Sequence, residues 1–136
     1  LEELMEAGRA SVNLVVSATG LEAAKVLEEL FGTPYVVGTP VGAAFQEELM
    51  QVLIETAKTG SSLKTNELLA VSSLPNSEIA VIGEGVTSLS LAQAIELEYG
   101  MGVKVLCATE CDRNLLRNKD VRFRLRKIQL FHFLMH

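Results

Sequence analysis

The sequence has few aromatic residues, few cysteines and no long apolar run. Aromatic residues make up 5% of the chain and tryptophan is absent, which weakens an interpretation as a stacking platform for single-stranded nucleic acid. No apolar stretch is long enough to span a bilayer, and no secretory leader pattern is recognisable. Cys107 and Cys111 are too few for a disulfide framework. We therefore expect a cytoplasmic protein with free thiols and no membrane partner.

Negative charge dominates most of the chain but not its end. The first 111 residues carry five Lys/Arg and fifteen Glu, whereas residues 112–136 carry seven Lys/Arg and two Asp. An acidic body argues against direct binding to nucleic acid or anionic lipid. Hydrophobic residues make up 49% of the 136 residues, so a packed core is expected. The first residue is Leu rather than Met, and we expect a piece of a longer protein.

The first half of the sequence has the pattern of a β-α-β unit. The stretch LEELMEAG indicates the end of a helix near Gly8, and an apolar, β-branched run predicts a strand over Val12–Ser17. An amphipathic stripe predicts a helix over Leu21–Phe31, with Gly32 ending it, and a second strand over Tyr35–Val37. The two strands are expected to be parallel, with a right-handed crossover.

A second unit follows after a long helix and a turn. The helix is predicted around Phe45 to Ala57 and ends at Gly60, and a short helix is predicted over Thr65–Val71. The turn LPNSE is the best boundary, which divides the chain into 1–74 and 75–136. Strands are then predicted over Ile79–Ile82 and Val103–Cys107, flanking a helix that ends at Gly100 or Gly102.

The pattern therefore predicts an α/β fold, a Rossmann-like parallel sheet flanked by helices and built from two βαβ units. The four strands could share one sheet. If the halves stay separate, each has two strands, which is marginal for an isolated sheet. We expect either a merged sheet or an oligomer.

The turn from Gly83 to Ser88 resembles the G-x-G-x-x-G pattern of dinucleotide-binding turns, with Ser88 in place of the third glycine. In that interpretation a pyrophosphate lies on the helix N-terminus and Glu110 holds a ribose. Glu84 counts against it, because its carboxylate lies where phosphate would bind. A tight strand-to-helix turn without a ligand is the alternative that the base rate favours.

Other candidate ligand groups are sparse. Cys107 alternates with Val105 in a predicted strand and is expected to be buried, whereas Cys111 is expected to be exposed. A cluster or zinc site needs more ligands than these thiols provide. His132 and His136 have helical spacing but no third ligand nearby. We assign no metal ligand and no catalytic residue.

Two segments together carry a resemblance to a known family. The stretches SVNLVVSATGLEAAKVLEELFGTPYVVGTPVG and EIAVIGEGVTSLSLAQAIELEYGMGVKVLCATE resemble consecutive parts of nitrogenase component 1-type oxidoreductases, over about Leu4 to Asp120. The resemblance implies that residues 1–74 are the C-terminal part of a middle domain and 75–136 the start of the next Rossmann-like domain. It also implies full-length relatives with iron-sulfur clusters, a sister component 1-type subunit, an iron-protein reductase that hydrolyses ATP, and a homo- or hetero-oligomer.

One position departs from the true nitrogenases. There the first strand ends in a cysteine that ligates the iron-molybdenum cofactor, and here Ser17 or Val16 stands at that position. A hydroxyl is a poor ligand for an iron-sulfur cage, so dinitrogen reduction is not expected. The turn formed by Ser17, Ala18, Thr19 and Gly20 still offers hydroxyls and backbone N–H groups to an anion or a tetrapyrrole carboxylate.

The sequence thus predicts a fragment of a nitrogenase-like oxidoreductase subunit with no cofactor of its own and no independent activity. Two alternatives remain open. One is a nucleotide-binding Rossmann-like module that uses the Gly83–Ser88 turn. The other is a cofactor-assembly scaffold without catalysis.

Overall fold

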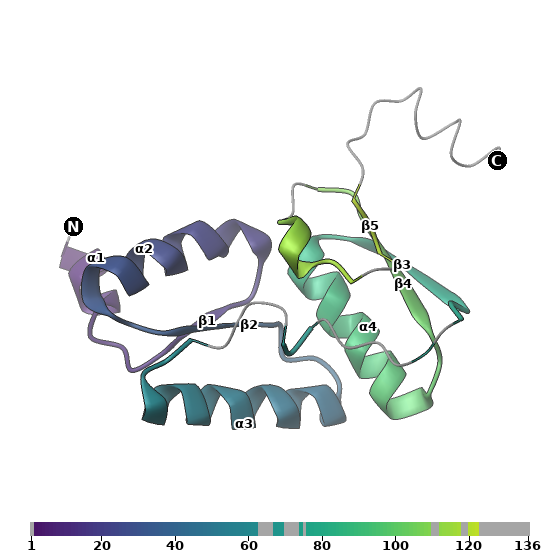
Figure 1. Ribbon diagram of the computed structural model, residues 1–136, viewed down its shortest axis with the longest axis horizontal. Coiled ribbons are helices and arrows are strands. Elements are labelled where there is room, and N and C mark those ends of the chain that lie inside the picture. The colour runs from purple at the N-terminus through teal and green to yellow at the C-terminus, as the bar shows by residue number, and fades with distance from the viewer. Residues whose placement is uncertain are drawn as a thin grey trace.

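The computed structural model describes residues 2–62, 67–69, 74, 76–109, 112–117 and 120–122 (Figure 1). Its helices and strands follow the predicted alternation. They are α1 (Glu2–Ala7), β1 (Asn13–Val15), η1 (Ala18–Gly20), α2 (Leu21–Phe31), β2 (Tyr35–Val37), α3 (Ala43–Thr59), β3 (Ile79–Gly83), α4 (Gly85–Tyr99), β4 (Val103–Cys107), η2 (Arg113–Leu115) and β5 (Val121–Arg122).

The first β-α-β unit is confirmed. Strands β1 and β2 pair in parallel, with Asn13 opposite Tyr35 and Val15 opposite Val37. Helices α2 and α3 lie on opposite sides of this small sheet (Figure 1). Gly32 ends α2 in the left-handed conformation at φ 70°, as its C-terminal position predicts. Strand β1 is shorter than predicted, because its ladder with β2 extends only to Val15.

The second unit contains one strand more than predicted. Strands β3, β4 and β5 form a parallel sheet in that order, and α4 packs against β3 and β4. Strand β5 has two residues, too few to leave a periodic pattern in the sequence. Helix α4 ends before Gly100, which has φ 64°. The predicted short helix over Thr65–Val71 lies largely outside the described residues, of which 67–69 form a turn.

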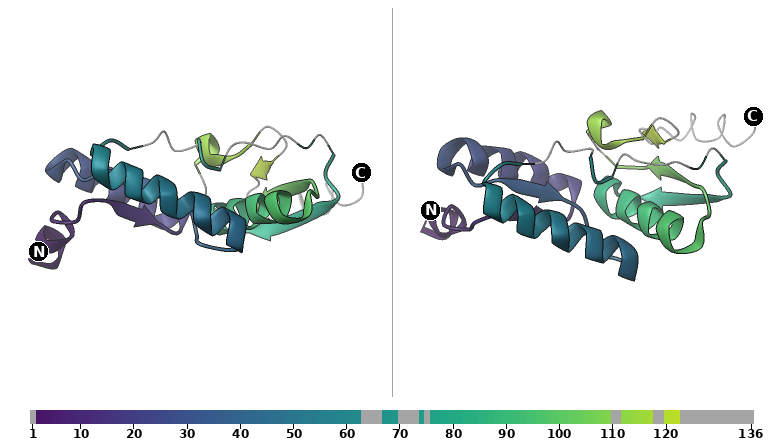
Figure 2. Two further views of the ribbon diagram at one scale, coloured as in Figure 1. Left: turned by 90° about the horizontal axis from the view of Figure 1, so that it is seen from below. Right: turned by 60° about the horizontal axis from the view of Figure 1, so that its bottom comes forward.

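Of the two arrangements left open by the sequence, a merged sheet or separate halves, the structure has the separate one. The structure has a two-stranded and a three-stranded sheet, and helix-to-helix packing of α3 against α4 joins them instead (Figure 2). The start of α3 and α4 lie close together at Gly42, where an added Cβ would lie 2.9 Å from the Cβ of Ala94. Nearby, the backbone N–H of Ala44 donates to the Glu98 carboxylate at 3.1 Å. This junction brings the N-terminal end of α3 beside the second half of α4.

The cores of the two units differ in how well they are covered. In the first unit, Phe45 and Leu49 of α3 are fully buried and pack beneath β2. In the second unit, α4 buries one face of its sheet, but Ala80 and Ile82 on the other face of β3 are exposed, Ile82 at 66%. Parallel sheets usually have both faces covered. In the described part of the chain, this outer face of β3 has no such cover.

A buried charged cluster holds the end of the second unit in place. The Arg117 guanidinium donates from Nε to Asp120 at 2.8 Å and from Nη2 to the Val103 carbonyl at 2.7 Å. Its Nη1 lies 3.2 Å from a carboxylate oxygen of Glu96 on α4. Asp120 also accepts from the N–H of Val105 at 2.8 Å. The cluster thereby links α4, β4 and the segment before β5.

Among the described residues, no helix is both long and apolar enough to cross a membrane.

Candidate functional site

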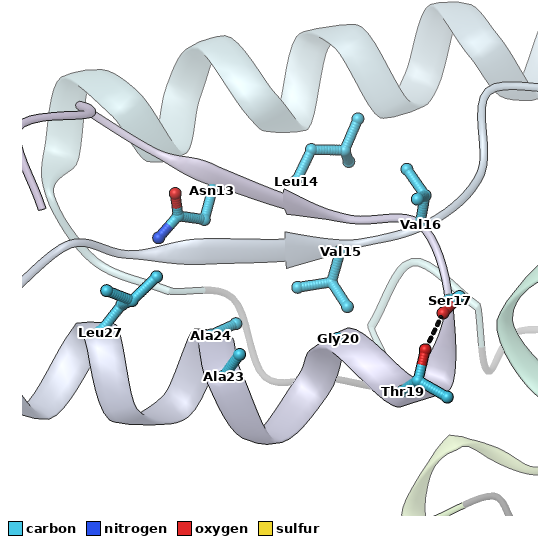
Figure 3. Close-up of a pocket in the computed structure, with 10 residues that line it drawn as sticks. All are labelled: Asn13, Leu14, Val15, Val16, Ser17, Thr19, Gly20, Ala23, Ala24 and Leu27. Carbon is cyan, nitrogen blue, oxygen red and sulfur yellow. Dashed lines mark hydrogen bonds between the residues drawn. The ribbon is translucent and has the colours of Figure 1, made fainter. Parts of the chain in front are cut away.

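The turn after β1 begins the candidate site. Ser17 is extended, with φ −149° and ψ 155°, and η1 then carries the chain directly into α2. The hydroxyl groups of Ser17 and Thr19 lie 2.6 Å apart and share a hydrogen bond (Figure 3). The N–H of Gly20 donates to the carbonyl of Ser17 at 3.1 Å. The predicted residues Ser17, Ala18, Thr19 and Gly20 therefore form one compact turn.

A pocket of about 340 Å³ lies beside this turn, between β1 and α2 (Figure 3). That volume is at the small end of the range for ligand pockets, roughly 300–1,000 Å³. Its lining is mainly apolar and contains no charged side chain. The Nδ2 atom of Asn13 is buried there without a hydrogen-bond partner. The lining residues are Asn13, Leu14, Val15, Val16, Ser17, Thr19, Gly20, Ala23, Ala24 and Leu27.

In the second turn, after β3, the carboxylate of Glu84 accepts hydrogen bonds from the free backbone N–H groups at the start of α4. Glu84 is the N-cap of α4, and its side chain accepts from the N–H groups of Val86 at 3.0 Å and Thr87 at 2.9 Å. These are the second and third helical positions, whose N–H groups have no partner within a helix. At Gly83 an added Cβ would lie 2.8 Å from the Ser88 hydroxyl, so this glycine permits the close turn.

The two turns meet at Glu84. Its Oε1 atom accepts from the N–H of Ala18 at 2.6 Å, although the two residues are 66 positions apart. Thr39, after β2, reaches the same place: its N–H donates to the Ser90 hydroxyl at 2.9 Å, and its hydroxyl donates to the Val16 carbonyl at 2.8 Å. The carboxyl ends of β1, β2 and β3 therefore converge on the first turns of α4.

Hydrogen bonding stabilises the charged form of Glu84 against the effect of burial. Burial alone would raise the pKa of this carboxyl group, but hydrogen bonds from the N–H groups of Thr87, Ala18 and Val86 act in the opposite direction. Together they place the pKa of Glu84 below its ordinary value of 4.5. The carboxylate is therefore an anion at neutral pH and lies against the positive end of the α4 dipole.

These contacts change what the predicted site residues can offer. The N–H of Ala18, expected to be available to an external anion, donates to Glu84 instead. The Ser17 and Thr19 hydroxyls are hydrogen-bonded to each other, and both residues line the pocket. In the Gly83–Ser88 turn, the N–H groups of Val86 and Thr87 that a pyrophosphate would need are already engaged. This geometry counts against the nucleotide-binding alternative, and its ribose residue, Glu110, lies outside the described residues.

The thiols and imidazoles do not add to this site in the described part of the chain. Cys107 is fully buried, as predicted, and its Sγ donates to the carbonyl of Thr109 at 3.4 Å. Cys111, His132 and His136 lie outside the described residues. Within the described ranges, no three His, Cys, Asp or Glu side chains are grouped as a metal site would require.

The fold and the site define a class: a Rossmann-like α/β protein with its candidate site at the carboxyl ends of parallel strands, where such folds bind ligands. The family model for nitrogenase component 1 type oxidoreductases matches residues 1–122, and the chain belongs to this family. No curated protein and no solved structure gives a significant match.

The turn after β1 does not fit an iron-sulfur cage of the kind that the family carries. Ser17 supplies a hydroxyl rather than a thiolate, and that hydroxyl is hydrogen-bonded to the hydroxyl of Thr19. The adjacent Ala18 N–H is engaged by a carboxylate from the second unit. Hard oxygen donors and an internal anion are poorly matched to a cluster that prefers soft thiolate ligands. No catalytic step through a cluster at this turn follows from these residues.

The reach of Glu84 across the two units is the main feature that sequence reasoning missed. A carboxylate just before a helix is a recognisable capping signal, so the sequence does indicate the N-cap role of Glu84. Its contact with Ala18 left no local signal, because the two residues lie on different β-α-β units. The same is true of Thr39 and Ser90, which join β2 to α4.

Proposed function

We propose that this chain is part of a nitrogenase component 1-like oxidoreductase subunit that receives electrons from an ATP-dependent iron-sulfur reductase. The match of the family model to residues 1–122 is the observation that carries the proposal. The parallel pairing of β1 with β2 and of β3 with β4 agrees with it. We further propose the division at residues 74 and 75, with 1–74 in a middle domain and 75–136 in the next.

The proposed subunit is not a dinitrogen reductase. The support for this part is that Ser17 or Val16, just after β1, stands where the resemblance to true nitrogenases calls for a cluster-ligating cysteine. The hydrogen bond between Ser17 and Thr19 and the engaged N–H of Ala18 support it further. The substrate proposed for the pocket beside this turn is a largely apolar molecule, because the lining is apolar with hydroxyls at one end and the Asn13 amide at the other.

A sister component 1-type subunit and an iron-protein reductase are the proposed partners, in an oligomer and in the cytoplasm. Exposed apolar side chains support an assembly. Ile82 on the bare face of β3 is 66% exposed, and Val16 beside the pocket is 49% exposed. Large apolar side chains left this exposed support contact with other protein segments.

The experiment uses the full-length subunit that contains this segment, purified under anaerobic conditions with its sister subunit and reductase. Oxidation of the reductase cluster is followed by its visible absorption with and without ATP. We expect ATP-dependent oxidation and no ammonia from dinitrogen. Ammonia formation would refute the exclusion of dinitrogen, and absence of ATP-dependent oxidation would refute the electron-acceptor role.

A further inference from the structure

Glu84 makes one hydrogen bond more than a helix cap requires. Its carboxylate satisfies the N–H groups of Val86 and Thr87, which is the ordinary function of an N-cap side chain. The third bond, from the N–H of Ala18 at 2.6 Å, is the shortest of the three and comes from the other β-α-β unit. The same carboxylate thus binds the start of α4 and the turn that precedes α2.

The length of the Glu84 side chain matters for this third bond. Aspartate is the commoner N-cap residue and is one methylene shorter, which suits the N–H groups of its own helix. The Glu84 backbone already has the extended conformation of a cap, with φ −70° and ψ 148°. The extra methylene lets one carboxylate oxygen stay on Val86 while it also reaches Ala18.

The bond lies at the position where an external anion would bind. Strand-to-helix turns present N–H groups to phosphate or carboxylate groups, and the helix dipole favours the negative charge. Here the N–H groups of Ala18, Val86 and Thr87 converge on a carboxylate that belongs to the chain. An external phosphate would have to displace it.

We propose that Glu84 is the positioning residue of the Ser17–Gly20 turn and that it excludes phosphate-bearing ligands from the point where the N–H groups of Ala18, Val86 and Thr87 converge. The identification of this turn as part of a ligand site rests on the proposed function. The contact itself does not, so the two ideas fail in different experiments. The consequence is that ligand selection at this site favours molecules without a phosphate group.

Glu98 provides a matched control on the same helix. Its carboxylate also accepts a backbone N–H from the first unit, that of Ala44 at 3.1 Å. The bond lies at the α3 end of the interface rather than at the Ser17–Gly20 turn. Shortening Glu98 therefore weakens a contact between the units without touching the turn that Glu84 positions.

The test is amide hydrogen exchange measured by NMR on the ¹⁵N-labelled chain and on Glu84→Asp. The shorter side chain keeps the cap but loses the reach, so exchange at the Ala18 amide rises by about tenfold to a hundredfold, as expected for loss of a charged hydrogen bond. Exchange at Val86 and Thr87 stays as in the native chain, which also shows that the variant folds. Glu98→Asp leaves exchange at Ala18 unchanged.

A second variant, Glu84→Gln, keeps the length and removes the charge. Its Ala18 amide exchanges faster than in the native chain but more slowly than in Glu84→Asp, because a neutral acceptor makes a weaker bond. Native protection of Ala18 in both variants would overturn the positioning role. Equal loss of protection at Ala18 and Val86 in Glu84→Asp would also overturn it, since the bond to Ala18 would then not be separable from the helix cap.

The exclusion of phosphate is tested with inorganic phosphate titrated into the native chain. The amide resonances of Ala18, Val86 and Thr87 are expected not to shift. Saturable shifts at these three amides would overturn the exclusion, because phosphate would then occupy the place assigned to Glu84.

Discussion

Replacing Arg117 by Met removes the cation that joins Glu96 and Asp120 in a buried cluster. The Arg117 side chain is 2% exposed, and the carboxylate side chains are 6% and 0% exposed. Nη1 has no hydrogen bond of good geometry, so its 3.2 Å approach to Glu96 is a contact between charges. The contacts to Asp120 and to the Val103 carbonyl are true hydrogen bonds.

The expected loss of stability follows from what the substitution leaves behind. Two carboxylates stay buried without their common cation, and the Val103 carbonyl loses a charged donor. Breaking a buried ion pair by removing one partner costs about 3–5 kcal/mol. A domain of ordinary stability has roughly 5–15 kcal/mol in total, so this single change removes a large part of it. Arg117→Lys keeps the charge but loses the planar fork, and we expect a smaller loss.

Urea unfolding followed by far-UV circular dichroism measures the effect as a shift of the midpoint at constant m-value. The matched control is Lys25→Met, because Lys25 pairs with Glu22 at 2.9 Å on the surface, where the side chains are 38% and 82% exposed. Exposed pairs contribute about 0–1 kcal/mol. If Arg117→Met shifts the midpoint no further than Lys25→Met, the cluster does not hold the second unit together.

Three further outcomes are expected. The pKa of Glu84 is lowered in the folded chain, so the charged carboxylate stabilises the native protein relative to Glu84→Gln. This difference in the free energy of unfolding is fully present above pH 4.5 and is lost as the pH falls through the lowered folded pKa. Urea titrations across this pH range measure it, and a difference that does not change with pH contradicts the prediction. Gly42→Ala costs about 1–3 kcal/mol of stability in thermal unfolding, which is more than Gly60→Ala, because both glycines have positive φ but only Gly42 is also crowded by Ala94. Equal losses in the two variants would count against the close approach of Gly42 to α4. Cys107 stays unlabelled by a thiol reagent in the native chain, since it is fully buried, and peptide mapping that finds rapid labelling there disproves this packing.

Local patterns in the sequence were sufficient for most of the helices and strands. The apolar stripe of α2 and the glycines after α2, α3 and α4 mark helix ends that the structure confirms at Gly32, Gly60 and Gly100. The strand pattern around Val103–Cys107 also correctly placed Cys107 in the core. These features depend on residues within one or two turns of each other, so the sequence carries them directly.

The arrangement of the sheets could not be read in the same way. A two-residue strand such as β5 leaves no period, and its pairing with β4 depends on the Arg117 and Asp120 contacts before it. The sequence leaves a merged sheet and separate halves as alternatives, because isolated two-stranded sheets are marginal. The packing of α3 on α4 supplies the missing burial instead, through side chains whose partners lie far away in the chain.

By itself, the sequence determined the order of strands and helices, the strand-to-helix turns and the presence of Ser17 and Glu84 in two of those turns. Only the tertiary structure decided that the two turns meet. The bond between Glu84 and Ala18 joins residues 66 positions apart, and the charges of Arg117, Glu96 and Asp120 are indistinguishable from solvated surface charges in a linear sequence. Local preferences act over a few residues, whereas burial and long-range hydrogen bonds arise only when separate units pack together.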